Sequence, residues 1–138
     1  MNKISLNTQL KKYQGLLGLL ERLQEILVSS DPLTSFTQIE AENFLELQNF
    51  YQQQMFPLGE ENFGEEVSPE TASRWRSLNT EIHRSMKLLA LDISLLKAAR
   101  SPQMQKNRRG GISDRLSTLI SYCQVILAPE QSIAADGS

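Results

Sequence analysis

The longest regular pattern of apolar and polar residues extends from Ser68 to Arg100. Apolar side chains recur in it at steps of three and four residues, at Ala72, Trp75, Leu78, Ile82, Met86, Leu89, Ile93 and Leu96. This spacing places all of them on one side of an α-helix. Ser68 suits an N-cap, Pro69 suits the first helical position, and Ser101-Pro102 predicts the end. We therefore expect one helix of roughly 45–50 Å here.

Three shorter patterns predict further helices, over about residues 5–28, 35–55 and 113–127. The first has an apolar face formed by Leu6, Leu10, Tyr13, Leu17, Leu20 and Leu27. The second has an apolar arc formed by Phe36, Ile39, Phe44, Leu47, Phe50, Tyr51 and Met55. The third has an apolar face formed by Leu116, Leu119, Ile120, Cys123 and Ile126. These faces predict that each helix packs against the others.

Local signals mark the ends of these helices. The second predicted helix begins at two overlapping capping boxes, Ser35-x-x-Gln38 and Thr37-x-x-Glu40, and ends before Pro57. Gly110-Gly111 lies just before the last predicted helix and is interpreted as a turn.

The four patterns together predict an all-α protein. The expected fold is a four-helix, largely antiparallel bundle with a long third helix. Residues 1–127 should form a single domain. Residues 128–138 have few apolar side chains to pack, so we expect a disordered tail.

A second apolar stripe lies on the first predicted helix, at Leu16, Leu19, Leu23 and Ile26. Two interpretations stay open. The helix is buried on two sides, or the stripe, with Leu19 and Ile26 furthest from the first seam, contacts another chain. The second interpretation includes a homodimer formed through this helix.

Composition sets broad limits. The chain has 138 residues, of which 40% are hydrophobic and 22% charged, as in ordinary globular domains. Its net charge of −2 argues against general nucleic-acid binding. The single cysteine, Cys123, cannot form an internal disulfide and fits a reducing compartment. The N-terminus does not resemble a signal peptide, and Leu16–Leu20 is too short to cross a bilayer. We expect a cytoplasmic protein without membrane insertion.

Charges are distributed unevenly. The connection before the long helix is acidic, with Glu60, Glu61, Glu65, Glu66 and Glu70. The connection after it is basic, with Lys97, Arg100, Lys106, Arg108 and Arg109. Solvated loops explain both clusters. The alternative is that Arg100, Lys106, Arg108 and Arg109 bind an acidic protein surface.

Asp92 is the one carboxylate placed within the apolar arc of the long helix. A buried carboxylate requires a partner, and Arg115 and Tyr122 on the next helix could supply one. We expect a structural contact, because no second acid or base accompanies Asp92. His83 is expected on the side opposite the apolar stripe, without the neighbours that a metal site requires. Cys123 is expected to be a buried, unreactive thiol.

Several phrases of the sequence resemble the cyanobacterial heterocyst-frequency control family PatD. They are Trp75-Arg76-Ser77-Leu78-Asn79-Thr80-Glu81-Ile82-His83-Arg84, Leu88-Leu89-x-x-Asp92-x-x-Leu95-Leu96-x-x-Ala99-Arg100 and Arg115-Leu116-x-x-Leu119-Ile120-x-Tyr122-Cys123-Gln124. With Tyr13-Gln14 and the leucines that follow, the resemblance covers most of residues 5–127.

The resemblance implies a small helical regulator that binds the cell-division protein FtsZ and influences heterocyst frequency. It implies no enzyme activity and no cofactor, and it assigns no contact residues. Two alternatives stay open: a general helical adaptor for protein interactions, and a helical enzyme that uses Asp92 in a pocket of the bundle. A nucleic-acid binder would require a basic stripe along a helix, which the sequence does not show.

Overall fold

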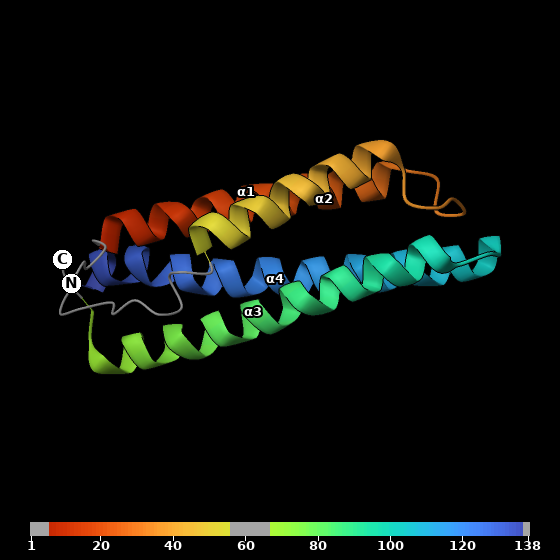
Figure 1. Cartoon of the computed structure of the whole chain (residues 1–138). Helices are drawn as coiled ribbons and strands as arrows, with labels where there is room; N and C mark the ends of the chain where they lie inside the picture. The colour runs from red at the N-terminus through yellow and green to blue at the C-terminus, as the bar shows by residue number, and fades with distance from the viewer. Residues whose placement is uncertain (1–5, 56–66, 137–138) are drawn as a thin grey trace.

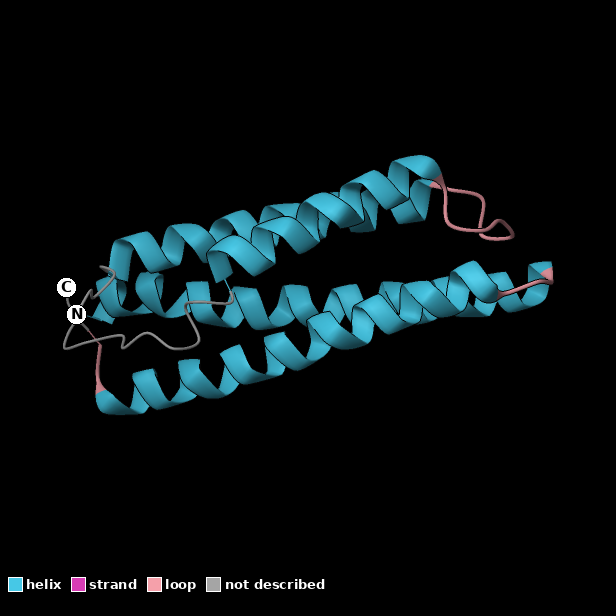
Figure 2. Ribbon diagram, in the orientation of Figure 1, coloured by secondary structure: helices cyan, strands magenta, loops and turns pink. Residues whose placement is uncertain are grey.

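The computed structural model describes residues 6–55 and 67–136, and within these ranges every regular element is helical (Figures 1 and 2). The elements are α1 (Leu6–Ser29), α2 (Gln38–Phe50), the π-helical turn η1 (Tyr51–Met55), α3 (Pro69–Ala98) and α4 (Pro102–Asp136). The chain runs up and down, so the α1–α2 and α3–α4 connections lie at the same end (Figure 1). The predicted all-α, antiparallel four-helix bundle is confirmed.

The inner pair of the bundle consists of α1 and α4. They pack against each other, while α2 packs mainly on α1 and α3 packs mainly on α4. All four helices contribute to one hydrophobic core, in which Trp75 is only 1% exposed. Tyr13 of α1 also donates a hydrogen bond to Oδ1 of Asn79 in α3 at 3.0 Å, within the core. The periodic apolar faces therefore meet along the length of the bundle, as helix amphipathicity predicts.

The predicted helix starts are largely correct. Ser68 caps α3, and its hydroxyl accepts a hydrogen bond from the Thr71 amide at 3.1 Å. Of the two capping boxes, the one formed is Thr37 with Glu40, so α2 begins at Gln38 rather than Ser35. Of the predicted acidic connection, Glu70 lies in the first turn of α3. Its other four glutamates, at positions 60–66, and the predicted stop at Pro57 lie outside the described residues.

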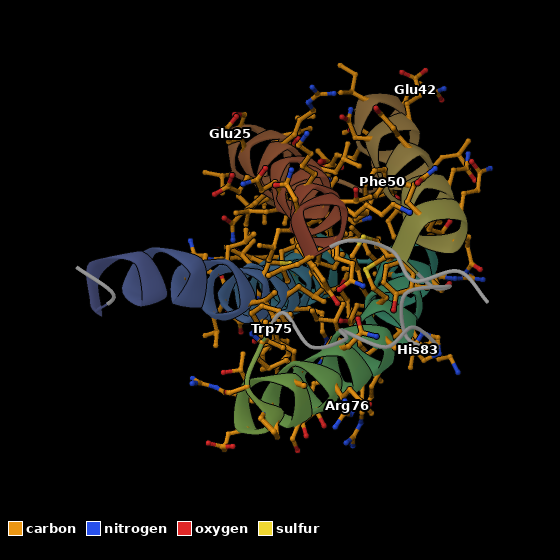
Figure 3. All side chains as sticks on the ribbon, turned by 90° about the vertical axis from the view of Figure 1, so that its left-hand side faces the viewer. Glu25, Glu42, Phe50, Trp75, Arg76 and His83 are labelled. Atoms are coloured by element: carbon orange, nitrogen blue, oxygen red, sulfur yellow. The ribbon has the colours of Figure 1, made fainter. Side chains whose placement is uncertain are left out.

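The fourth helix differs from its prediction at both ends. It begins at Pro102, where the Ser101 hydroxyl accepts from the Met104 amide at 3.1 Å, and it passes through Gly110-Gly111 without a turn. Arg109 and Ile112 are buried in register with Leu116, and this packing outweighs the low helix propensity of the glycines. The helix also continues to Asp136, where a tail was predicted, in a segment rich in alanine. Its last turns project away from the other helices (Figure 3).

The second stripe of the first helix is largely internal. Leu16 and Leu23 are fully buried, because α1 packs on α4 with one side and on α2 with another. The contact with α2 is close at Gly15, where an added Cβ would lie 2.8 Å from the ring of Phe50. Of the two interpretations of this stripe, burial of the helix on two sides is therefore correct for Leu16 and Leu23. No helix in the described part of the chain is long and apolar enough to cross a membrane.

Candidate partner-binding surface

The last turns of α1 are surrounded by adjoining surface hollows. One hollow, of about 290 Å³, lies between α1 and α4; it is lined by Val28 and Leu27 of α1 and by Lys106, Gly110 and Ser113 of α4. A second hollow, of about 460 Å³, lies between the end of α1 and the start of α2 and is lined by Ile26 and Ile39. We define the α1-end surface as Ile26, Val28, Ile39, Lys106, Gly110 and Ser113.

The α1-end surface exposes large aliphatic side chains. Val28 is 73% exposed and Ile39 is 59% exposed, although both belong to well-formed helices. Ile26 is half-buried beside Ile39. Val28 borders the hollow toward α4, and Ile39 borders the hollow toward α2, so the exposed aliphatic groups lie on two sides of the end of α1. Exposed aliphatic side chains beside hollows are typical of interaction surfaces.

Lys106 provides the positive charge of the hollow between α1 and α4. It is exposed at the hollow's edge. Arg109 also lines this hollow, but its charge is neutralised by a buried carboxylate. Glu25 lines the adjoining hollows and points outward from α1 (Figure 3). The surface therefore combines aliphatic groups with one cation on the α4 side and one carboxylate, Glu25, in the adjoining hollows.

Arg109 forms the most extensive polar contact between distant parts of the described chain. Its Nη1 and Nη2 atoms donate to Oε2 and Oε1 of Glu40 at 2.6 and 2.8 Å. Nε donates to the Thr34 carbonyl at 2.9 Å, and Nη2 to the Ser35 carbonyl at 2.7 Å. The guanidinium thus joins α4 to both the α1–α2 connection and the first turn of α2.

Glu40 is fully buried, and its environment keeps it ionised. Burial alone raises the pKa of a carboxyl group, but the hydrogen bonds from Arg109 and from the Thr37 amide, together with the charge of Arg109, outweigh burial. The pKa of Glu40 is consequently lowered. The predicted role of Arg109 in an exposed partner contact is wrong, because its side chain is 5% exposed and fully used inside the protein.

The other predicted basic residues do not form one group. Lys106 and Arg108 are both exposed, but two residues of helix separate their side chains by about 200° around α4. Arg100 is exposed at the α3–α4 connection. Lys97 lies 5.7 Å from the ring centre of Phe36, in a cation–π contact. From Pro102 onward the predicted basic connection is therefore a helix, and Lys106 is its exposed cation at the hollow beside α1.

The glycines of α4 are not required by internal packing. A Cβ atom added at Gly110 or at Gly111 would meet no atom within 4 Å. Glycine in a helix interior costs about 0.5–1 kcal/mol relative to alanine. Gly110 leaves the backbone of α4 accessible at the hollow beside Val28. Gly110-Gly111 was noticed in the sequence, but it was interpreted as a turn rather than as an open stretch of helix.

Asp92 makes the contact expected with Arg115. Nε of Arg115 donates to Oδ2 of Asp92 at 3.1 Å, and the two side chains are 32% and 18% exposed. Tyr122 is half-buried against the hydrophobic core, and the described part of the chain shows no hydrogen bond between it and Asp92. The pair joins α3 to α4 through a single hydrogen bond at the edge of the core.

His83 was expected on the side of α3 opposite the apolar stripe, but it packs against η1. Its ring stacks with that of Tyr51 at 6.0 Å between centres, and the Tyr51 hydroxyl lies 3.2 Å from His83 Nδ1. Burial, with a smaller effect of Lys87, lowers the pKa of His83. Cys123 is buried, as predicted, and burial raises its pKa to about 12, with a smaller effect of Glu21. The thiol is thus protonated and shielded.

The two residues proposed on the first helix differ in accessibility. Leu19 is partly buried against the core, whereas Ile26 borders the hollow toward α2. Sequence periodicity could not separate them, because they lie on the same stripe. Val28 was not predicted as a contact residue. Ile39 was assigned to the apolar arc of the second predicted helix, which is wrong, because its side chain is 59% exposed.

Comparison of the chain with known protein families, with curated proteins and with solved structures gave no match in any of the three. The resemblance to the PatD family stays a prediction.

Proposed function

We propose that this chain is a non-enzymatic, cytoplasmic regulator that binds FtsZ and modulates its assembly, as the resemblance to the PatD family implies. The observation that supports protein binding best is the α1-end surface. There, exposed Val28 and Ile39 line surface hollows at the end of α1. A partner segment would bury these aliphatic groups and gain the corresponding hydrophobic free energy.

The hollow between α1 and α4 favours one chemistry in the partner. An apolar side chain would rest on Val28 and on the bare backbone at Gly110, while a carboxylate would contact Lys106. Charge complementarity of this kind contributes mainly to association rate and specificity, and aliphatic contact contributes more to affinity.

Four single variants test this surface in two matched pairs. Lys106→Glu reverses a charge at the hollow, whereas Arg108→Glu reverses one on a different face of the same helix. Gly110→Leu fills the hollow, whereas Gly111→Leu adds the same side chain one residue away. All four positions are exposed and open, so the fold should persist.

The assay is sedimentation of purified FtsZ polymers with each variant. We expect wild type, Arg108→Glu and Gly111→Leu to co-sediment, and Lys106→Glu and Gly110→Leu to remain in the supernatant. If wild type neither co-sediments nor changes the amount of pelleted FtsZ, the assignment of FtsZ fails. Retention of binding by all four variants would instead exclude the α1-end surface and leave Leu19 and Arg100 to be tested.

A general adaptor is the second candidate function. It uses the same surface for another acidic protein segment, and it becomes the leading interpretation if FtsZ does not bind.

A further inference from the structure

A small cavity lies on the other flank of the bundle, where η1 approaches α3. Its volume is about 130 Å³. An engineered cavity of roughly 150 Å³ in another protein accommodates benzene. The size therefore suits a compact organic molecule with one ring or a short branched chain.

The cavity has an apolar floor and a polar rim, and none of the described residues that line it is acidic. Met86 and Ala90 of α3 provide the apolar surface. The polar residues that line it are Gln48, Gln52 and Lys87, together with Tyr51 and His83, which are hydrogen-bonded to each other. Hydrogen-bond donors and a cation above an apolar floor favour a ligand that carries both a carboxylate and an apolar body.

The π-helical turn gives this cavity a defined wall. Tyr51 and Met55, the first and last residues of η1, are both directed into the core. Tyr51 stacks on His83 and is hydrogen-bonded to it, so both rings are held in place beside the cavity. His83 lies on the flank of α3 that faces the end of α2 (Figure 3). Single π-helical turns occur frequently at functional sites.

We propose that this cavity is a binding site for a small organic carboxylate of about the size of benzoate. The apolar body contacts Met86 and Ala90, and the carboxylate accepts hydrogen bonds from Lys87 and from the carboxamides of Gln48 and Gln52. No residue of the α1-end surface takes part, so the inference is independent of protein binding.

The experiment follows backbone amide chemical shifts of the full chain by NMR during titration with benzoate, and separately with benzyl alcohol. We expect saturable shifts around Tyr51, His83 and Ala90 with benzoate, and clearly weaker binding of the uncharged alcohol. Lys87→Gln should weaken benzoate binding about two- to fivefold, the range for one partly exposed ion pair. Lys106→Gln, which removes the same charge outside the cavity, should bind as wild type does.

A second variant tests the cavity itself. Ala90→Leu adds three carbon atoms to the floor and should abolish the benzoate shifts while the spectrum stays folded. The proposal is overturned if benzoate produces no saturable shifts at these residues, or if benzyl alcohol binds equally well. It is also overturned if Lys87→Gln binds benzoate as tightly as wild type.

Discussion

Replacing Arg109 with methionine should destabilise the protein strongly. The change removes a two-pronged contact with Glu40 and two hydrogen bonds to the carbonyls of Thr34 and Ser35. Methionine retains an apolar chain of similar length, so the main loss is polar. Glu40 stays fully buried without its cation. Removing one member of a buried ion pair typically costs about 3–5 kcal/mol.

The size of this loss makes it measurable. A domain of this length has a free energy of unfolding of about 5–15 kcal/mol. A loss of 3–5 kcal/mol corresponds to a fall in melting temperature of about 10–20 °C. Urea titration followed by circular dichroism gives the free energy directly. Arg108→Met is the matched control, because Arg108 is exposed on the same helix, and its expected cost is below about 0.5 kcal/mol.

A double-mutant cycle separates the ion pair from its surroundings. Glu40→Gln keeps the capping box with Thr37, because glutamine also serves at this position, but it leaves Arg109 without a counter-charge. The double variant Arg109→Met/Glu40→Gln should therefore cost less than the sum of the single variants. Strict additivity would show that the two residues do not act as a pair.

The pH dependence of stability tests the same pair in another way. Because the folded-state pKa of Glu40 is lowered, its contribution is complete above the unfolded-state pKa, about 4.3. The contribution is lost as pH falls through the folded-state pKa. The stability difference between wild type and Glu40→Gln should thus be largest near neutral pH and shrink in acid. A difference that stays constant from neutral pH to strongly acidic pH, or an Arg109→Met cost below about 0.5 kcal/mol, would refute the reasoning.

Three further predictions concern the packing of the bundle. Gly15→Ala should destabilise by about 1–3 kcal/mol, because the added methyl group overlaps the ring of Phe50, whereas Gly18→Ala meets no atom and should stabilise by about 0.5–1 kcal/mol; thermal unfolding of both distinguishes close packing from propensity alone. Trp75→Ala should cost about 3–5 kcal/mol in urea unfolding, and a loss near zero would contradict its burial. Asp92→Asn should cost at most about 1 kcal/mol by the same measurement, because its ion pair is partly exposed; a loss above about 3 kcal/mol would indicate a fully buried contact.

The sequence by itself determined the fold class and much of the helical register. Apolar residues spaced by three and four decide which side of a helix is buried, so Trp75 and Leu89 were assigned to the core without knowledge of their neighbours. Helix starts that depend on local hydrogen bonds, at Ser68 and Thr37, were also predictable. Arg115 was predicted as the contact of Asp92 because the apolar pattern shows which face of each helix carries these residues, and the two helices were expected to be antiparallel.

Only the tertiary structure decided the roles of Arg109, Gly110 and His83. Local propensity predicted a turn at Gly110, but packing of the surrounding residues of α4 kept the chain helical. That helix directs Arg109 inward to Glu40, which is 69 residues away in the chain, and turns Lys106 toward the hollow at α1. His83 faces a cavity because Tyr51, at the start of η1, packs against it across the gap between the two helices. These contacts join residues that are far apart in sequence, and no local pattern carries information about such pairs.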